Sequence, residues 1–415
     1  MKRSHPLLET LTSLRGNPRA CVWTEPLWGI PYNLYAPYAT LYMYALGVND
    51  VQIGYIASIG MVLQILFSLL GGVVTDKLGR RLTTLLFDLV AWSGASLVWA
   101  LSQNFGHFLI AAGLNAVMRV PMNSWTGLLA EDAPKDKIVS IYALIYICGL
   151  GAAFFSPLSG LLVDRFGVIP TMRGLYWLTF VLMTTKIVGL YFLTTETAVG
   201  RQRMADTRNT SIFRLLGQYG GVIGRILRNP DTLLTLSLMV VMNVVGVVNG
   251  TFWTLYAAET VDVPDGLIAL FPFLKSIAML TSFFTFVPRI RPDRFRRPML
   301  TGFVLFAASQ LLLITAPHKG VLLLCVSIIL EAFAVALINP LLDSMQILMV
   351  DPAERSRIIS LLFVAVIALS SPFGAIAGLL SSVDRRLPFA LILVLLGIGF
   401  LLALNARKPE SESRR

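Results

Sequence analysis

The strongest constraint on the fold is a series of long apolar runs separated by polar connections. A helix needs about 20 apolar residues to cross the hydrocarbon core of a membrane. Twelve such runs lie near residues 23–46, 51–72, 83–101, 108–129, 138–162, 174–195, 232–257, 266–288, 298–316, 321–343, 358–380 and 388–405. Each must be helical because lipid offers no partner for backbone polar groups. The sequence therefore predicts an all-α integral membrane protein with twelve transmembrane helices.

The composition supports the same class. Charged residues make up 14% of the chain, against about 25% in soluble proteins. Hydrophobic residues make up 56%, more than a soluble core of this size could hide. The lipid bilayer is therefore the expected solvent, and no soluble stretch is large enough to form a separate domain.

The placement of basic residues predicts the orientation. With the N-terminus in the cytoplasm, 26 of the 34 Lys and Arg fall in cytoplasmic segments and three fall within spans. The five in external segments are Arg165, Arg173, Lys319, Arg385 and Arg386. This is the positive-inside pattern. It predicts a multi-pass protein of the plasma membrane with both termini cytoplasmic, and it explains the net charge of +11 without nucleic-acid binding.

One long connection, from Glu196 to Asn229, divides the chain. Its first part, residues 201–206, is polar and is expected to be mobile, whereas residues 212–227 have the spacing of a surface-lying amphipathic helix. The predicted organisation is a cytoplasmic N-terminal segment at 1–22, a six-helix bundle at 23–195, a cytoplasmic linker with an amphipathic helix at 196–230, a second six-helix bundle at 231–405, and a cytoplasmic tail at 406–415.

Short sequence matches relate the two halves. The pairs are 76–81 with 293–297, 137–141 with 357–361, and Ser156-Pro157 with Ser371-Pro372. The matches keep their order and an offset of 215 to 220 residues. Parallel repeats of this kind predict two pseudo-symmetric bundles.

The loop between the second and third spans carries a family resemblance. It combines an acid, three bases and two glycines in a short polar stretch, namely Gly72, Asp76, Lys77, Gly79, Arg80 and Arg81. The loop closely resembles the motif of the major facilitator superfamily. The resemblance implies the fold of that superfamily and a secondary transporter that works by alternating access.

The resemblance also implies that this loop is a cytoplasmic gate that latches the outward-open state. Gly72 would let two helices approach closely, and Gly79 would permit a tight turn. Asp76 would cap a helix or pair with a base. The three basic residues would anchor the loop at the inner leaflet. Glu131 and Asp132, directly after the fourth span, are the candidate acidic partners.

Small residues in the fifth span resemble a packing motif of exporter branches of the superfamily. They are Ala152, Ser156, Pro157 and Gly160. Ala and Ser replace two glycines of that motif and Leu161 replaces a third, but small size is kept at the first two positions. The resemblance implies export, with close packing against the other half. An ordinary proline bend in a small-residue helix is the alternative.

Charged residues within spans are costly and need a reason. Arg119 in helix 4 and Glu331 in helix 10 lie near mid-span, and the resemblance places both helices beside a central cavity. We therefore predict that they face each other, with Glu331 as proton carrier; a static structural pair is the alternative. Lys275 is a further candidate for substrate contact. Lys186 and Asp88 are expected to support the scaffold, Asp88 through the basic loop.

Aromatic and amide side chains are expected to line the cavity. The candidates are Asn33 and Tyr38 in helix 1, and Asn249 and Trp253 in helix 7. Pro26, Pro31 and Pro37 could bend helix 1. The three histidines show no metal-ligand spacing and no phosphate-binding loop occurs, so neither an enzyme nor a cofactor is predicted.

The favoured function is proton-coupled export of small amphipathic organic compounds by a monomeric carrier. Its partners would be the small-molecule substrate, protons and the lipid bilayer. A symporter or exchanger of an organic anion is the alternative within transport, because Arg119, Lys275 and Lys186 outnumber the mid-span acids. Ion-free exchange is also left open. From another class, the alternative is a non-transporting membrane receptor or scaffold with the same fold.

Overall fold

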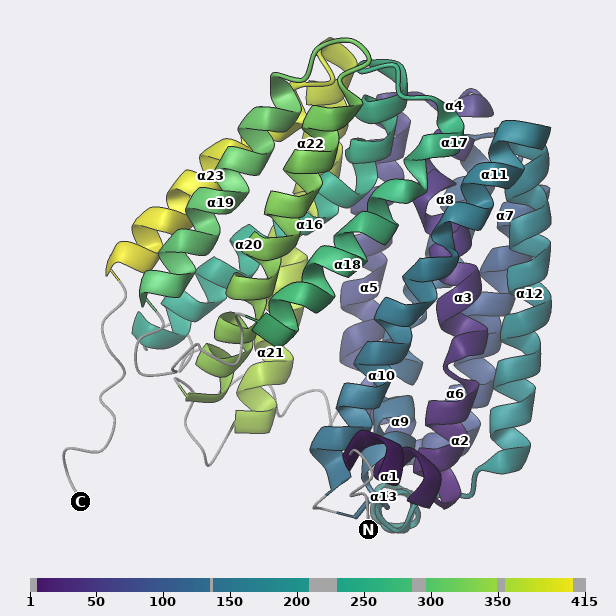
Figure 1. Ribbon diagram of the computed structural model, residues 1–415. Coiled ribbons are helices and arrows are strands. Elements are labelled where there is room, and N and C mark those ends of the chain that lie inside the picture. Colours follow the sequence, from purple (N-terminus) through teal and green to yellow (C-terminus); the bar gives the residue numbers. More distant parts are fainter. Residues whose placement is uncertain (1–5, 135–136, 209–229, 286–295, 349–354, 406–415) are drawn as a thin grey trace, which may run out of the picture. The chain divides into compact units, whose positions relative to one another are not determined.

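The computed structural model describes residues 6–134, 137–208, 230–285, 296–348 and 355–405 (Figure 1). The described part is helical, with no strand in it. Eleven helical segments there are long and apolar enough to cross a membrane. The predicted all-α membrane fold is confirmed. The first predicted span, near 23–46, is not among these eleven segments, and the structure divides it into short helices.

The chain forms two compact units. Unit 1 contains Met1–Val48 and Ile59–Gly217, and unit 2 contains Asn49–Ser58 and Gln218–Arg415. The first turns of the second span thus count with unit 2, which the sequence did not indicate. Glycines explain the close packing there, since a Cβ on Gly54 would lie 2.5 Å from the Gly374 carbonyl oxygen. The domain bounds proposed from the sequence remain predictions.

Unit 1 is built from short and long helices. They are α1 (Pro6–Ser13), α2 (Gly16–Thr24), α3 (Pro26–Tyr35), η1 (Ala36–Tyr38), α4 (Ala39–Ala45), α5 (Asp50–Leu78), α6 (Arg80–Asp88), η2 (Leu89–Gly94), α7 (Ala95–Leu101), α8 (Phe105–Ala116), α9 (Arg119–Ala130), α10 (Ile138–Ala152), η4 (Ala153–Phe155), α11 (Ser156–Phe166), α12 (Val168–Leu193) and α13 (Ala198–Thr207).

Prolines explain most of the breaks in these helices. A proline nitrogen cannot donate the helical hydrogen bond, and its ring crowds the preceding turn. Pro26 begins α3, and Pro37 lies in the 3₁₀ turn η1, so two of the three prolines predicted to bend helix 1 stand at its breaks. Pro121 follows the break between α8 and α9, and Pro157 follows η4. The first span is therefore a series of short helices rather than one long helix.

The third span contains a π-helical segment, η2. Such a segment widens the helix and leaves a backbone carbonyl to find another partner. The Ala91 carbonyl accepts a hydrogen bond from the Asn115 side chain of α8, at 3.0 Å. The π segment directly follows Asp88, the last residue of α6, and contains Trp92.

The N-terminal segment is part of unit 1. Leu14 and Cys21 are buried in an apolar cluster with Leu128 and Leu190. The Asn17 side chain accepts a hydrogen bond from the Thr195 backbone N–H at 2.9 Å. The N-terminal residues 1–22 were expected to lie outside the helix bundle. Leu14, Asn17 and Cys21 instead pack against one end of that bundle.

Unit 2 contains α16 (Pro230–Glu259), α17 (Asp265–Ile268), α18 (Leu270–Thr285), α19 (Arg296–Ile314), α20 (Val321–Leu348), α21 (Arg355–Ser370), α22 (Pro372–Val383) and α23 (Leu387–Asn405). Its apolar clusters include Leu236, Leu362 and Val366. Pro372 begins α22 just as Ser156-Pro157 begins α11, so this predicted repeat has the same local structure in both units. The match of 137–141 with 357–361 falls at the start of a helix in both units, α10 and α21, and the match of 76–81 with 293–297 extends outside the described residues.

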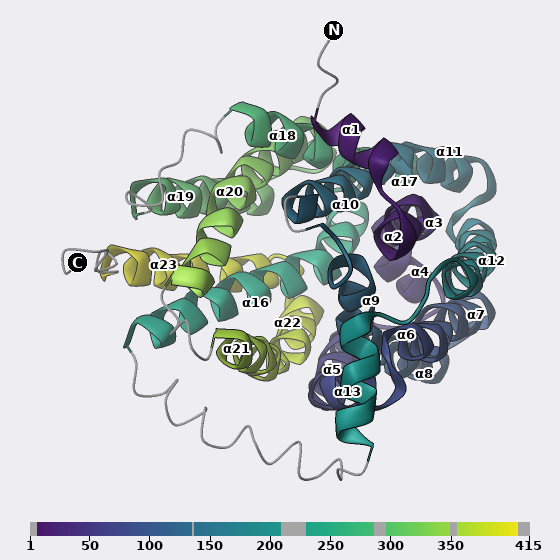
Figure 2. The same cartoon turned by 90° about the horizontal axis from the view of Figure 1, so that it is seen from below.

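The start of the long connection is helical. Residues 201–206, expected to be mobile, lie within α13. Seen from below, α13 extends across the end of unit 1 (Figure 2). The amphipathic helix predicted at 212–227 lies outside the described residues.

Candidate functional site

The predicted tight turn at Gly79 is present. Gly79 joins α5 to α6 with φ +82°, a backbone conformation that favours glycine. A Cβ there would lie 2.5 Å from a Glu196 carboxylate oxygen and 2.7 Å from the Met204 sulfur. Glycine is therefore needed both for the turn and for the close approach of the segment after α12.

Arg80 is the centre of an ionic network. Its guanidinium lies 3.2 Å from the Asp76 carboxylate and 3.0 Å from the Glu131 carboxylate. The Arg80 residue is only 7% exposed, so these partners compensate a charge removed from solvent. Two predicted pairings, Asp76 with a base and Glu131 with the loop, are thereby brought together. Arg80 does not serve as a surface anchor.

Glu196 is a member of this network that the sequence did not reveal. The first N–H groups of a helix lack partners within it, and the N-cap Gly79 has no side chain to supply one. The Glu196 carboxylate accepts the N–H of Arg80 at 2.9 Å and that of Arg81 at 3.0 Å. Glu196 directly follows the sixth predicted span, and this position was the one sign in the sequence that it could reach the loop.

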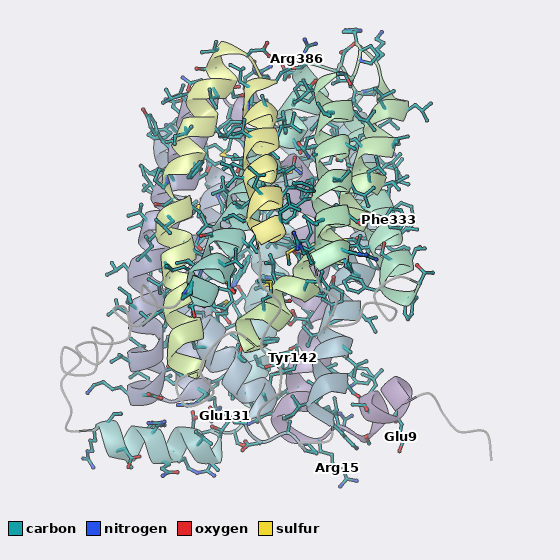
Figure 3. The ribbon with its side chains drawn as sticks, turned by 90° about the vertical axis from the view of Figure 1, so that its left-hand side faces the viewer. Glu9, Arg15, Glu131, Tyr142, Phe333 and Arg386 are labelled. Atoms are coloured by element: carbon teal, nitrogen blue, oxygen red, sulfur yellow. The ribbon has the colours of Figure 1, made fainter. Side chains whose placement is uncertain are left out.

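Helix α13 completes the network. The Thr197 hydroxyl donates to Glu131 at 2.5 Å, and the Thr207 hydroxyl donates to the Asp76 carbonyl at 3.0 Å. Glu131 lies directly beside α13 in Figure 3. The Lys77 ammonium donates to the Thr207 carbonyl at 3.3 Å. The loop is thus fastened to the beginning of the long connection.

Three details of the loop differ from the sequence interpretation. Asp132 contacts Asn17, at 3.2 Å, rather than the basic loop. Arg81 stacks on the Tyr191 ring, 3.9 Å from its centroid, rather than extending to the membrane surface. Gly72 has open space at its Cβ position, whereas a Cβ on Gly71 would lie 3.0 Å from the Arg119 carbonyl oxygen. Gly71 is therefore the glycine that permits close helix packing here.

Arg119 occupies the first turn of α9, directly after a break in the span. Its Nε donates to the Gln64 side chain at 2.7 Å, and a second nitrogen lies 3.8 Å from the Met122 sulfur. Both partners are neutral. Arg119 lies in unit 1 and Glu331 in unit 2, so their predicted pairing remains a prediction.

Glu331 has a partner that the sequence did not assign to it. The Lys275 ammonium of α18 lies 2.5 Å from the Glu331 carboxylate of α20. The Glu331 side chain is 4% exposed and the Lys275 side chain 35% exposed. Both residues were singled out as charges within spans, but their pairing depends on which faces of the two helices meet.

The predicted cavity residues have varied environments. Asn33 donates to the Gly29 carbonyl of its own helix at 2.8 Å, and Tyr38 is fully buried. The Asn249 Oδ1 and the Trp253 indole N–H are buried, and neither has a hydrogen-bond partner among the described residues. These two residues are one turn apart on α16, so one bound group could satisfy both. Their role in binding remains a prediction.

The small residues of the fifth span lie at its bend. Ala152 and Ser156 are buried on either side of the 3₁₀ turn η4. A Cβ on Gly29 of α3 would lie 3.1 Å from the Ala152 Cβ, so this part of the motif packs inside unit 1. Packing against the other half remains a prediction.

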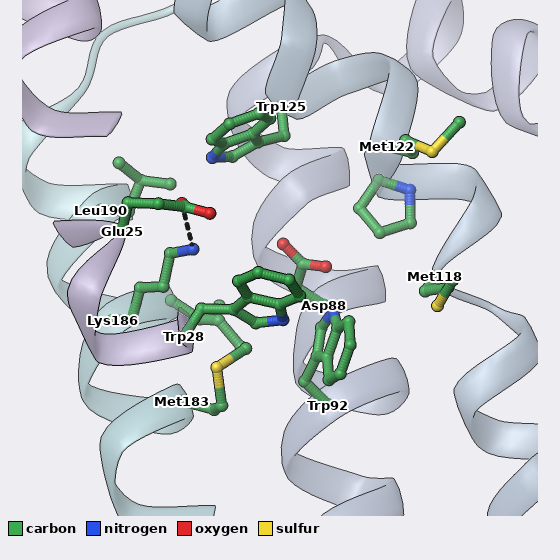
Figure 4. Close-up of a pocket in the computed structure, with 12 residues that line it drawn as sticks. Glu25, Trp28, Asp88, Trp92, Met118, Met122, Trp125, Met183, Lys186 and Leu190 are labelled. Atoms are coloured by element: carbon green, nitrogen blue, oxygen red, sulfur yellow. Dashed lines mark hydrogen bonds and ion pairs between the residues drawn. The ribbon is translucent and has the colours of Figure 1, made fainter. Parts of the chain in front are cut away.

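Unit 1 also contains a pocket that the sequence interpretation did not identify. Its volume is about 280 Å³, and α3, α6, α9 and α12 with their neighbouring segments contribute to its wall. Its charged residues are Glu25, Asp88 and Lys186, and its aromatic residues are Trp28, Trp92 and Trp125. Methionine and aliphatic side chains complete the lining (Figure 4).

An ion pair forms one side of this pocket. The Lys186 ammonium lies 2.8 Å from the Glu25 carboxylate, and each side chain is 9% exposed. Lys186 was expected to belong to the scaffold, and Asp88 to support the basic loop. Asp88 instead lines this pocket, two turns into α6 from the loop.

Comparison with known proteins identifies the class of the chain. A sequence model of the Major Facilitator Superfamily matches residues 29–297 and 292–415. The chain belongs to this superfamily of membrane transporters.

Among similar proteins, the multidrug resistance protein MdtG of Salmonella paratyphi A is 24% identical over 285 residues, which cover 65% of this chain and 66% of MdtG. The chain thus spans just under two thirds of that relative. A crystal structure of the nucleoside transporter NupG matches with a TM-score of 0.72 and 14% identity. The match covers 94% of this chain and 100% of the NupG chain. A POT family transporter in complex with 5-aminolevulinic acid matches with a TM-score of 0.71 and 14% identity, over 95% and 98% of the two chains. These structures show the fold.

Proposed function

We propose that this transporter exports small amphipathic organic compounds in exchange for protons, as a monomer in the plasma membrane with both termini cytoplasmic. The family supports transport by alternating access, and the likeness to MdtG supports efflux. The small residues of the bent fifth span are consistent with the exporter resemblance.

The observation that carries the proton coupling is the Lys275–Glu331 pair. Glu331 is almost fully buried, and its compensating charge is the partly exposed Lys275. A proton bound to Glu331 would remove the attraction that holds Lys275 at 2.5 Å. The lysine could then turn toward water or substrate. Glu331 would thus link proton binding to a rearrangement of unit 2.

Proton flux in proteoliposomes tests this proposal. The purified protein is reconstituted with a pH-sensitive dye inside, a pH gradient is imposed, and cationic, neutral and anionic amphipathic compounds are added in turn. We expect proton movement with an amphipathic compound, which Glu331→Gln abolishes. Asp262→Asn, an exposed acid of unit 2, is the matched control and should leave the flux unchanged. Flux that survives Glu331→Gln would remove Glu331 from the coupling mechanism.

Arg119 supports a second candidate, symport or exchange of an organic anion. Its guanidinium lies within a span, and Gln64 and Met122 compensate it only as neutral groups. An anion could supply the missing charge. Proton movement stimulated by organic anions and lost in Arg119→Gln would favour this candidate over export. No proton movement with any compound would oppose both and favour ion-free exchange or a receptor or scaffold.

We also propose that the Gly79 loop, residues 72–81, is a cytoplasmic gate. The buried Arg80, its partners Asp76 and Glu131, and the cap from Glu196 form a closed network that could break and reform as a unit. Substituted-cysteine accessibility at the cytoplasmic side should increase in Glu131→Gln. Unchanged accessibility would oppose a gating role.

A further inference from the structure

The pocket of unit 1 has an uneven distribution of charge. Among the described residues that line it, two carboxylates, Glu25 and Asp88, face one ammonium group, Lys186. With both acids ionised, the pocket has a net charge of −1. One ammonium group can neutralise only one of the two carboxylates. The position of that ammonium therefore decides which carboxylate is left to pair with a bound ligand.

Lys186 makes its ion pair with Glu25, and its charge acts on Asp88 only through space. Its ammonium lies 2.8 Å from the Glu25 carboxylate. It also lies 5.9 Å from the centroid of the Trp28 ring and 5.8 Å from that of Trp125, within range of cation–π attraction. With the side chain 9% exposed, little freedom remains for it to turn away. Lys186 is therefore a resident cation that occupies one side of the pocket.

Asp88 is the carboxylate left available. Within the described residues no hydrogen bond or ion pair holds it. Figure 4 shows the Lys186–Glu25 pair joined on one side of the pocket, with Asp88 separate from it. Because a carboxylate inside a membrane-spanning bundle needs a counter-charge, a bound cation would relieve Asp88.

The remaining walls suit a flat aromatic body. The Trp28 and Trp92 rings meet edge to face, with centroids 5.7 Å apart and an interplanar angle of 84°. Methionine side chains in the same lining supply polarisable sulfur atoms. The Trp125 indole N–H is buried and has no acceptor among the described residues. It could donate a hydrogen bond to a ligand oxygen or nitrogen. The rings themselves are uncharged, so they do not neutralise Asp88.

The main chain is adapted at the same place. The π segment η2 begins directly after Asp88 and contains Trp92. Pro121 lines the pocket one turn after the break that begins α9. Two of the helices that form the wall thus depart from regular geometry where they meet it. Such departures often accompany function.

We propose that this pocket binds a small organic cation with a flat aromatic ring system, with Asp88 as its counter-charge and the three tryptophans as its walls. That the bound cation is also transported rests on the proposed function; the binding itself does not. A pocket of about 280 Å³ suits a compound of two fused rings and is slightly smaller than the range of about 300 to 1,000 Å³ for ligand sites.

Three probes of the same shape test the charge preference. They are N-methylquinolinium as the cation, quinoline as the neutral compound and quinoline carboxylate as the anion. Binding to the purified full-length protein is followed by tryptophan fluorescence and confirmed by calorimetry. We expect the cation to bind about tenfold more tightly than quinoline, and the anion to bind most weakly.

The variant Asp88→Asn tests the counter-charge. It should weaken binding of the cation about tenfold and change binding of quinoline by less than about twofold, which also shows that the pocket remains folded. Asp164→Asn, an exposed acid on α11, is the matched control and should bind all three probes as the unmodified protein does. Equal cation affinity in Asp88→Asn, or tighter binding of the anion than of the cation, would overturn the proposal.

Flux measurements separate this proposal from the function. Cation binding that depends on Asp88, without proton movement in proteoliposomes, would support the pocket and oppose proton-coupled export. Proton movement with an amphipathic compound, together with cation binding unaffected by Asp88→Asn, would support export and oppose the pocket.

Discussion

Each unit contains a buried glutamate paired with a lysine of a spanning helix, and the two pairs differ in exposure. In unit 1, the Lys186 ammonium and the Glu25 carboxylate are 2.8 Å apart and each side chain is 9% exposed. In unit 2, the distance between Lys275 and Glu331 is 2.5 Å, but the lysine side chain is 35% exposed and the glutamate side chain 4%. We call the first pair closed because both side chains are buried, and the second pair open because its lysine is partly exposed.

This difference separates two uses of the same chemistry. Breaking a closed pair leaves a charge buried without compensation, which is strongly destabilising. A lysine that the protein encloses only in part can leave its partner at a smaller cost. The unit 1 pair is therefore suited to holding a pocket in shape, and the unit 2 pair to changing state.

The largest expected effect is on stability. Glu25→Gln leaves the enclosed Lys186 without its paired carboxylate and should lower the free energy of unfolding by about 3 kcal/mol. Glu331→Gln leaves a partly exposed Lys275, so we expect a loss of about 1 kcal/mol. Unfolding in mixed micelles, followed by circular dichroism, gives both values. Equal losses would show that the two pairs are energetically alike.

Replacing each lysine by arginine should give the next largest difference. In Lys186→Arg, a planar guanidinium must fit between Trp28 and Trp125, and overpacking should cost about 2 kcal/mol. The Lys275 side chain is enclosed only in part, so Lys275→Arg should change stability by less than about 0.5 kcal/mol. The same unfolding assay measures both. A larger loss for Lys275→Arg would reverse the assignment of the closed and open pairs.

Accessibility to a water-soluble thiol reagent should differ by about tenfold. In a background without the three native cysteines, Lys275→Cys should react faster than Lys186→Cys, because the exposed fractions of the native side chains are 35% and 9%. Asp164→Cys, at an exposed position, gives the upper limit of the rate. Similar rates at positions 186 and 275 would contradict the difference in exposure.

The smallest expected effect concerns Cys21, one turn before Glu25. Burial raises the pKa of the Cys21 thiol to about 12, and the Glu25 charge adds to this effect while Lys186 opposes it. The folded protein should therefore resist alkylation at mildly alkaline pH, whereas protein unfolded in detergent should react. Because the thiol ionises more readily when unfolded, its contribution to stability should fall as the pH rises above 9.0, its ordinary pKa. Glu25→Gln should speed the reaction, and an unchanged rate would argue against coupling between the two groups.

Much of the fold was predictable because the bilayer imposes strong length and polarity requirements. The apolar runs indicated the spanning helices, and Pro37 and Pro157 indicated two of the bends. Polarity alone did not show that the N-terminal segment packs into unit 1. Leu14 and Cys21 are buried there by contacts with α9 and α12, which lie far away in the sequence.

The candidate site was predictable only where the partners are constrained by a short loop. Arg80 could reach few acids, and the structure brings it together with Glu131, one of the two that were proposed. Lys275 and Glu331 were each recognised, but hydropathy does not determine the rotation of a helix that is apolar all round. Glu25 and Asp88 were missed as pocket residues for the same reason, since their convergence depends on the breaks in their helices.

The cap that Glu196 provides to α6 has a practical consequence for dividing the chain. Residues just after the sixth span look like a free tether, but the side chains of Glu196, Thr197 and Thr207 hold the end of unit 1 together. A split transporter cut before Glu196 would leave the first fragment without any of these bonds. The same cut made beyond Arg208 would preserve every one of these bonds, so half-proteins and inserted tags should be designed from that point onward.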